Sequence, residues 1–221
     1  MRKIILFLIL VFAVSGCGSK KRPMWLIYGN GQLDIYKNYF LTKDSPDNAE
    51  LHFQNAIDEI KKSGNLDVMQ KAWLTRMALH VAMLKKAEPG DFGKIAELKP
   101  VPANENYYLF LAGKPDAVNA DLLPPQYAGF LNALKTGNSD EAEKAILSMK
   151  DDPVSQMVAA GIAVRDRIDN EAIIRAAMET ASYNGWKAAL LVWMERLSGY
   201  LSSHGKETEA LKIRRHMELI K

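Results

Sequence analysis

Residues 45–65 read SPDNAELHFQNAIDEIKKSGN, and this stretch carries the local signals of an amphipathic helix. Ser45 is a favoured N-cap, Pro46 suits the first helical position, and Gly64 suits the residue after the last turn. The apolar residues recur at three- and four-residue steps, which places them on one helical face. They are Ala49, Phe53, Ala56, Ile57 and Ile60. The stretch predicts a helix with one buried face and two marked ends.

A second helix is expected directly after this turn. From Asn65 onward, apolar side chains form a stripe that continues down to Lys85 and Lys86. The stripe consists of Leu66, Met69, Trp73, Met77, Val81 and Leu84. Because the connection is so short, the two helices should lie antiparallel as a hairpin.

The last third of the chain repeats this pattern of short helices with polar turns. The expected helices cover residues 126–137, 138–150 and 153–167, followed by one capped at Asp169. Residues 184–221 should close the chain as a long hairpin that turns at Gly205. We therefore expect an all-α fold in which antiparallel hairpins stack.

The middle of the chain is less regular, because prolines interrupt the helical pattern. They are Pro89, Pro100, Pro102, Pro115, Pro124 and Pro125. A short helix capped near Asn104 and stopped at Gly113 still fits between them.

Residues 25–36, WLIYGNGQLDIY, are the one place where strands compete with a helix. Gly-Asn-Gly stands there between two apolar patches, as in a β-hairpin. Leu33, Tyr36 and Phe40 also fit a helical face, and an isolated two-stranded ribbon is only marginally stable. A loop followed by a helix is the favoured interpretation.

Three turn segments, KKSGNLDVM, LKTGNSDEA and SSHGKETEA, share a glycine, and the last hairpin resembles the tetratricopeptide repeat. Gly137 and Gly205 are separated by about twice the ~34 residues of one such unit. The residues that match the motif are Leu197, Ser198, Leu201, Gly205 and Ala210. The motif's closing proline is missing, and Met217 replaces its later small residue. The resemblance covers the last hairpins best, the first hairpin only loosely and the proline-rich middle hardly at all. With the stacking expected of the other hairpins, it implies a tetratricopeptide-like α-solenoid over residues 24–221 with an irregular proline-rich middle.

The first sixteen residues have the layout of a secretory signal peptide. Arg2 and Lys3 precede an apolar run over residues 4–14, and two small residues follow. The run is about half of the ~20 residues that a helix needs to cross a bilayer. Residues 1–16 are therefore expected to be a signal that is removed.

The residues Val14-Ser15-Gly16-Cys17 resemble the lipobox of bacterial lipoproteins. In that family the cysteine thiol receives a diacylglycerol, the signal is cut before it, and the new amino terminus is acylated. The resemblance implies that Cys17 is lipidated and that residues 17–23 form a tether. Gly18 follows where an Asp would retain an enterobacterial lipoprotein at the inner membrane, which implies the periplasmic face of the outer membrane in a Gram-negative organism.

Cys17 is the only cysteine in the chain, so no intramolecular disulfide can account for it. An ordinary export signal with an incidental cysteine, or a free thiol in a cytosolic protein, is the alternative to lipidation.

The charge balance argues against nucleic-acid binding. The chain has 29 Lys and Arg against 26 Asp and Glu, and two of the basic residues lie in the predicted signal. The remainder is nearly neutral with interspersed signs, which is not a nucleic-acid footprint. Lys20, Lys21 and Arg22 form one short basic cluster, which could contact anionic head groups or simply be a solvated linker.

No catalytic, cofactor-binding or metal-binding set is expected. His52, His80, His204 and His216 are scattered, with no His-Glu-x-x-His pattern. The serines before His204 lack a Gly-x-Ser-x-Gly elbow and fit a polar helix end. Asp151-Asp152 precede Pro153 and fit a helix cap.

The aromatic residues fit a core better than a peptide-binding face. Trp186, Leu190 and Trp193 share one helical face, with leucine and methionine between them. The ten methionines are likewise expected to be mainly core residues, with an adaptable binding groove as the alternative.

Together these features predict a lipid-anchored periplasmic lipoprotein that binds another envelope protein as a scaffold or assembly factor. The pilus and secretin assembly lipoproteins have a similar plan, although no motif here singles them out. Neither a nucleic acid nor a small-molecule cofactor is expected. The alternative is a periplasmic enzyme acting on cell-wall material, whose active site is assembled from dispersed residues.

Overall fold

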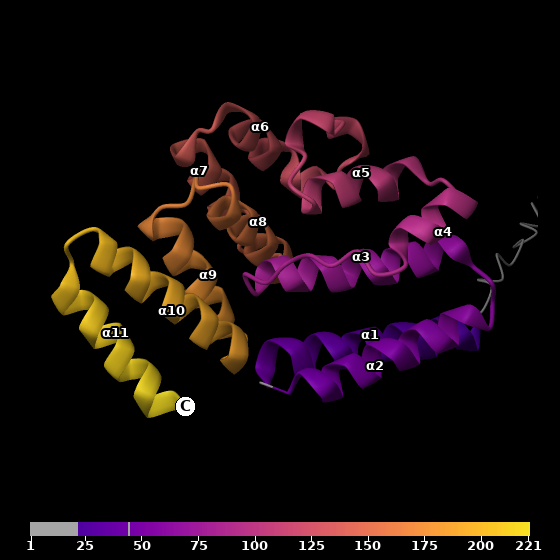
Figure 1. The fold of residues 1–221 in the computed structure, drawn as a ribbon, viewed down its shortest axis with the longest axis horizontal. Coiled ribbons are helices and arrows are strands. Elements are labelled where there is room, and N and C mark those ends of the chain that lie inside the picture. Colours follow the sequence, from indigo (N-terminus) through magenta and orange to yellow (C-terminus); the bar gives the residue numbers. More distant parts are fainter. Residues whose placement is uncertain (1–21, 44) are drawn as a thin grey trace, which may run out of the picture.

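The computed structural model describes residues 22–43 and 45–221, so Cys17 and the predicted signal lie outside the described residues. The described part contains eleven α-helices, three short 3-10 helices and no strand, which confirms the all-α prediction. The α-helices are α1 (Met24–Thr42), α2 (Pro46–Lys61), α3 (Leu66–Ala82), α4 (Phe92–Leu98), α5 (Pro102–Leu111), α6 (Ala128–Thr136), α7 (Ser139–Ser148), α8 (Pro153–Arg165), α9 (Glu171–Tyr183), α10 (Lys187–Ser203) and α11 (Glu207–Ile220). Most of them pack as antiparallel pairs in chain order (Figure 1).

The start of α1 corrects the interpretation of residues 25–36. The helix begins at Met24 and continues through Gly29 and Gly31, so the expected loop before it is wrong. A Cβ added to Gly29 would lie 3.2 Å from Cγ1 of Ile60. Glycine costs a helix interior about 1 kcal/mol, but here it lets α1 approach α2 closely. Packing between α1 and α2 therefore outweighs the low helix propensity of the glycine.

The predicted hairpin of α2 and α3 is confirmed. All five apolar residues of the expected α2 face are buried, and Gly64 adopts a φ of 63° in the turn. Oδ1 of Asn65 accepts a hydrogen bond from the Val68 N–H at 3.1 Å and caps α3. The helix ends at Ala82, before the expected Lys85 and Lys86, because Leu84 has a φ of 54° and turns the chain away.

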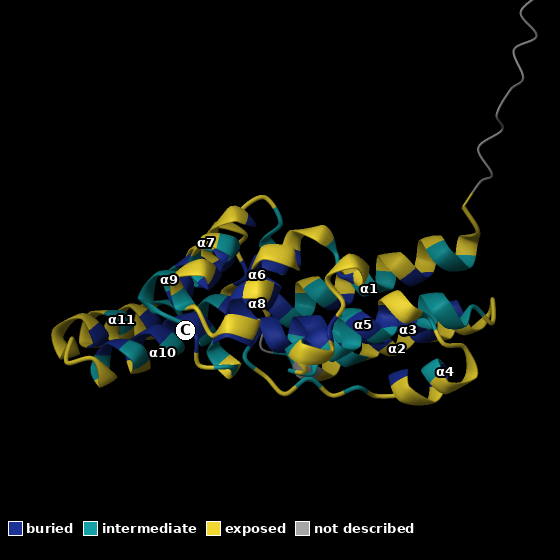
Figure 2. Ribbon diagram, turned by 90° about the horizontal axis from the view of Figure 1, so that it is seen from above, coloured by how far each residue is buried: buried dark blue, intermediate teal, exposed yellow. Residues whose placement is uncertain are grey.

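α3 and α8 form the centre of the molecule. Residues 155–163 of α8 are all buried, and α3 is buried on several sides rather than along one stripe. The two helices cross at Gly161, where an added Cβ would lie 2.1 Å from the carbonyl oxygen of Val81. A helix that is apolar all round must be surrounded. The buried positions accordingly gather where the helices meet in the middle of the molecule (Figure 2).

The proline-rich middle differs from expectation in two details. The short helix α4 was not expected, and α5 begins at Pro102 rather than near Asn104. The side chain of Asn104 is buried, and its amide donates to Oδ1 of Asp67 at 2.8 Å and to Oε1 of Gln70 at 3.0 Å. Asn104 therefore ties α5 to α3 instead of capping its own helix.

The second half consists of the pairs α6–α7, α8–α9 and α10–α11, with Gly137 and Gly205 in left-handed turns as expected. The cap of α9 is Asn170, not Asp169, since Oδ1 of Asn170 accepts from the Ile173 N–H at 3.0 Å. The Asp169 carboxylate instead pairs with Arg196 on α10. α8 ends two residues before the expected boundary at Arg167, which has a φ of 59°.

Contacts between the two halves hold the hairpins together. Trp186 and Trp193 are buried, which confirms that they belong to the core. The Trp193 indole N–H donates to the carbonyl oxygen of Ala82 at 3.0 Å, joining α10 to the end of α3. α10 also packs on α1. In a regular solenoid each repeat contacts only its neighbours, and these long-range contacts depart from that plan while keeping the stacked hairpins.

Candidate functional site

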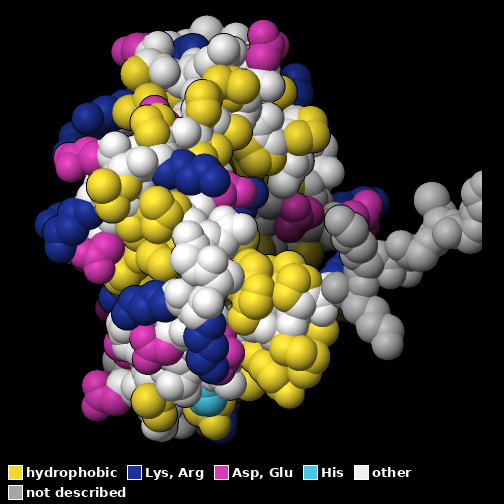
Figure 3. Space-filling model, turned by 90° about the vertical axis from the view of Figure 1, so that its right-hand side faces the viewer, with side chains coloured by type: hydrophobic (Ala, Val, Ile, Leu, Met, Phe, Trp, Pro, Cys, Tyr) yellow, Lys and Arg dark blue, Asp and Glu magenta, His cyan; other side chains and the backbone are white. Residues whose placement is uncertain are grey.

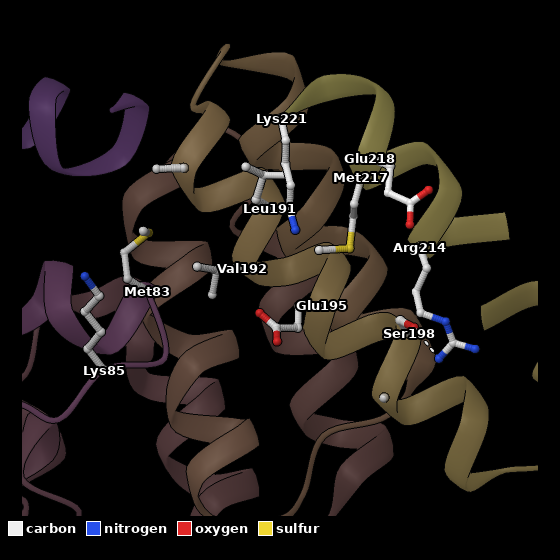
Figure 4. A pocket seen from close by; sticks show the side chains of 12 residues that line it. Met83, Lys85, Leu191, Val192, Glu195, Ser198, Arg214, Met217, Glu218 and Lys221 are labelled. Carbon is white, nitrogen blue, oxygen red and sulfur yellow. Dashed lines mark hydrogen bonds between the residues drawn. The ribbon is translucent and has the colours of Figure 1, made fainter. Parts of the chain in front are cut away.

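A cavity of about 650 Å³ lies between the end of α3 and the α10–α11 hairpin, and we call it the C-terminal groove (Figure 4). Its larger apolar side chains are Met83, Leu191, Val192 and Met217. Its charged residues are Lys85, Glu195, Arg214, Glu218 and Lys221. Figure 4 shows Glu195 and Lys221 extending into the hollow, while Met83 and Lys85 face it from α3. The groove thus combines an apolar floor with charges of both signs.

The framework of the groove is set by packing on its two sides. Trp193 fixes α10 against α3 through its bond to Ala82, and Ala210 and Met217 are the buried residues through which α11 packs. Gly199 contributes no side chain, and an added Cβ there would meet nothing within 4 Å. The hollow is therefore a product of helix packing.

The basic residues of the groove are partly occupied by neighbours. The Arg214 guanidinium pairs with Glu207 and lies 3.4 Å from the hydroxyl oxygens of Ser198 and Ser202. The Lys85 ammonium lies 5.0 Å from the centre of the Phe40 ring, which is a cation–π distance.

The acidic residues of the groove have fewer neighbouring partners than Arg214 and Lys85. Neither Glu195 nor Glu218 forms an ion pair with any residue that the structure describes. Two carboxylates therefore stand over the apolar floor without a partner within the described part of the chain. An amphipathic segment with one apolar face and flanking basic residues would match this arrangement.

Ser198, which lines the groove, lacks the partners that a serine nucleophile needs. A serine nucleophile needs a base within about 2.6–3.2 Å and a third group that orients the base. Ser198 is buried, and its hydroxyl donates to the carbonyl oxygen of Ala210 at 3.4 Å. Its charged neighbour is Arg214, which cannot accept a proton.

Two further cavities of about 480 Å³ each flank α3, and most of their cations are in ion pairs. In the cavity beside the end of α3, Arg165 donates to the carbonyl oxygen of Leu111 at 2.6 Å and pairs with Asp166. Lys86 in the same cavity lies 3.0 Å from the carboxylate of Glu88. The other cavity lies against α5 and includes Tyr107. Lys85 also lines the cavity beside the end of α3, and it lies over the Phe40 ring rather than in an ion pair with a described residue.

The titratable groups with shifted pKa values do not converge on one cavity. Burial, reinforced by Arg76, lowers the pKa of His80, whose ring stacks on Phe40 at 4.9 Å. Burial raises the pKa of Tyr107 and of Tyr127, whose hydroxyl oxygens are 3.5 Å apart. These groups stay neutral at neutral pH, as expected of core residues.

The residues considered as sites from the sequence are placed as follows. Asp152 caps α8 by accepting from the Ser155 N–H at 3.1 Å, as expected. Ser203 and His204 form a polar helix end, each within 2.8 Å of the carbonyl oxygen of Tyr200. Over residues 22–43 and 45–221, no group of three or more His, Cys, Asp or Glu residues could hold a metal ion.

The C-terminal groove was missed by sequence reasoning. Met83 and Met217 come from opposite parts of the chain, and only the α3–α10 contact brings them together. The one signal was the number of methionines, which favoured a core and left a groove as the alternative.

Comparison with known proteins adds no relative. No protein-family model matches the chain, and neither a curated protein nor a solved structure matches it. Among the helices of the described residues, none combines the length and apolarity needed to span a membrane.

Proposed function

We propose that the protein is a lipid-anchored lipoprotein at the periplasmic face of the bacterial outer membrane. In this proposal it holds another envelope protein in the C-terminal groove, as a scaffold or assembly factor. The observation that carries the binding role is the groove itself, a hollow with an apolar floor and two carboxylates that form no ion pair within the described part of the chain. The lipobox resemblance of Val14-Ser15-Gly16-Cys17 supports the anchor.

The groove favours a partner segment over a small substrate. Its walls come from two helices and the end of a third, and charged side chains stand among its apolar ones. Such a surface suits an amphipathic helix laid into a groove. The partner's apolar face would contact Leu191, Val192 and Met217, and its basic side chains would pair with Glu195 and Glu218.

The anchor is tested by metabolic labelling with palmitate. Wild-type protein should be labelled and recovered with the membrane, whereas Cys17→Ser should lose both properties. A wild-type protein that stays unlabelled and soluble would contradict the anchor.

The groove is tested by photo-crosslinking in cells. A photoreactive residue at Val192, inside the groove, should give one discrete crosslinked product. The matched control is the same residue at Tyr183, which is 93% exposed on α9 and should give none. Charge reversal of Glu195 and Glu218 to Lys should remove the product at Val192.

The enzyme hypothesis is tested by an activity assay that is read together with the crosslinking result. The full-length protein, purified in detergent, is incubated with isolated cell-wall material, and soluble fragments are measured. Release of fragments together with no product at Val192 would replace the scaffold by the enzyme.

A further inference from the structure

α1 exposes an apolar stripe on the side that faces away from the core. Met24, Ile27, Tyr28 and Ile35 are 57%, 46%, 55% and 37% exposed. They recur with Gly31 at three- and four-residue steps and therefore share one helical face. Gly29 and Tyr36 occupy the opposite face and are buried. Figure 3 shows hydrophobic side chains gathered beside the point where the chain enters α1.

The first ten residues of α1, Met24–Leu33, contain no charged side chain. The outer face of the other terminal helix, α11, also exposes apolar residues, but Lys212, Arg215 and Glu218 stand among them. Such a charge-free stretch is unusual for a helix that faces water, because solvent-facing helix surfaces are charged or polar. The first charge of α1 is Asp34, which pairs with Lys37 at 3.2 Å. The stripe is therefore a surface made for an apolar or interfacial environment.

The position of the stripe in the chain identifies that environment. Six residues separate Cys17 from Met24. The seven steps from Cys17 to Met24 therefore span at most about 25 Å at ~3.6 Å per step. If the Cys17 lipid is in the bilayer, as the proposed function states, the tether keeps the start of α1 within this distance of the membrane surface. A large part of the apolar stripe is then within contact range of the head groups.

The neighbouring residues fit the same surface. Lys20, Lys21 and Arg22 directly precede α1, and anionic head groups attract such basic segments. Trp25 and Tyr28 lie in the first turns of the helix, and these residue types are enriched where membrane meets water. A protein partner would explain the apolar stripe but not its place directly after a lipid tether that contains a basic cluster.

We propose that α1 lies on the phospholipid surface, with Met24, Ile27, Tyr28 and Ile35 inserted among the head groups as a second contact beside the Cys17 lipid. This inference rests on the proposed lipid anchor. The C-terminal groove lies at the opposite end of the molecule from the start of α1 (Figure 1).

The experiment measures the depth of a spin label on the full-length lipoprotein. Because Cys17 is the only cysteine and its thiol would carry the lipid, Tyr28→Cys introduces one free thiol for labelling. The labelled protein is reconstituted into vesicles of phosphatidylethanolamine with a minority of phosphatidylglycerol. Collision with oxygen, which concentrates in the bilayer, is compared with collision with a water-soluble nickel chelate.

The matched control is Tyr183→Cys on α9. The ratio of oxygen to nickel collisions should be several-fold higher at position 28 than at position 183. Adding Ile27→Glu next to the label should return position 28 to the value of the control, because a charge opposes insertion.

Three results are distinguishable. A lipidated protein whose position 28 is as open to nickel as position 183 would overturn the inference and leave the anchor intact. Strong spin–spin broadening at position 28 would show that a second copy covers the stripe and would also overturn it. A protein without lipid on Cys17, recognised by absent palmitate label and a second reactive thiol, would remove the anchor on which the inference rests.

Discussion

The aromatic cluster of α1–α3 and the capped turns of α7–α9 stabilise two parts of the molecule in different ways. In the first, the Phe53 ring lies 5.4 Å from Tyr36 and 4.8 Å from Trp73, so residues from three helices meet. In the second, the helices begin at side chains that accept backbone N–H groups. These caps are Asn138 for α7, Asp152 for α8 and Asn170 for α9.

This difference concerns the range and size of the stabilising contacts. Each buried aromatic side chain removes about 150–250 Å² from water, and the rings depend on residues far apart in sequence. Each cap contributes about 1 kcal/mol and depends on residues two or three positions away. Loss of one aromatic contact should therefore lower the free energy of unfolding by a large amount and weaken all of α1–α3 cooperatively. Loss of one cap should lower it by a small amount, so the second part loses stability stepwise.

The strongest test of this comparison is Phe53→Ala in the aromatic cluster. Phe53 is fully buried, and Arg76 lies 5.4 Å from its ring centre. Replacing a buried phenylalanine with alanine lowers the free energy of unfolding by about 4 kcal/mol. Urea titration followed by circular dichroism should show this loss as a lower midpoint of a single transition.

Leu51→Ala is the matched control on the same helix. Leu51 is 57% exposed, so its truncation should change the free energy of unfolding by less than about 0.5 kcal/mol. Equal losses at the two positions would contradict the aromatic cluster as the main support of α1–α3.

A second test addresses the crossing that joins the two parts. Gly161→Ala would bring a Cβ to 2.1 Å from the carbonyl oxygen of Val81 and 2.9 Å from its carbonyl carbon. Because both atoms are backbone, α3 and α8 must move apart, and we expect the free energy of unfolding to fall by about 3 kcal/mol. Thermal unfolding should show a clear decrease in Tm.

Gly199→Ala controls for the effect of alanine in a helix. Gly199 lies in α10 with nothing within 4 Å of its added Cβ, so alanine there should raise the free energy of unfolding by about 0.5–1 kcal/mol. The same substitution should therefore have opposite signs at the two glycines. A stabilised Gly161→Ala protein would exclude the close α3–α8 crossing.

The two parts also differ in how far the sequence predicts them. Glycine turns such as Gly64, Gly137 and Gly205 were predicted because their signals lie within a few residues of the turn. The helix at residues 25–36 was not, because Gly29 favours a loop until Ile60 packs against it. Local signals thus predict the turns of the hairpins. Whether a glycine-containing segment such as residues 25–36 is helical depends on packing between helices.

The candidate site was less predictable than the fold. The lipobox resemblance is local and could be recognised directly, and it predicts Cys17 as the lipid-bearing residue. The C-terminal groove depends on the bond from Trp193 to Ala82, which sets the end of α3 against α10. No local pattern encodes a hollow between residues so far apart, so the groove required the three-dimensional structure.

The smallest expected effect is at Asn138, the cap of α7. Its Oδ1 accepts from the N–H groups of Asp140 and Glu141 at 3.1 Å each, and Asn138→Ala would leave both donors to water. The free energy of unfolding should fall by about 1 kcal/mol, whereas Asn138→Ser keeps an acceptor and should change it by only a few tenths of a kcal/mol. Hydrogen exchange should speed up for the first turn of α7 in Asn138→Ala and stay unchanged in α1–α3. Faster exchange throughout α1–α3 would mean that this turn supports the whole molecule, and the contrast between cooperative and stepwise loss would then fail.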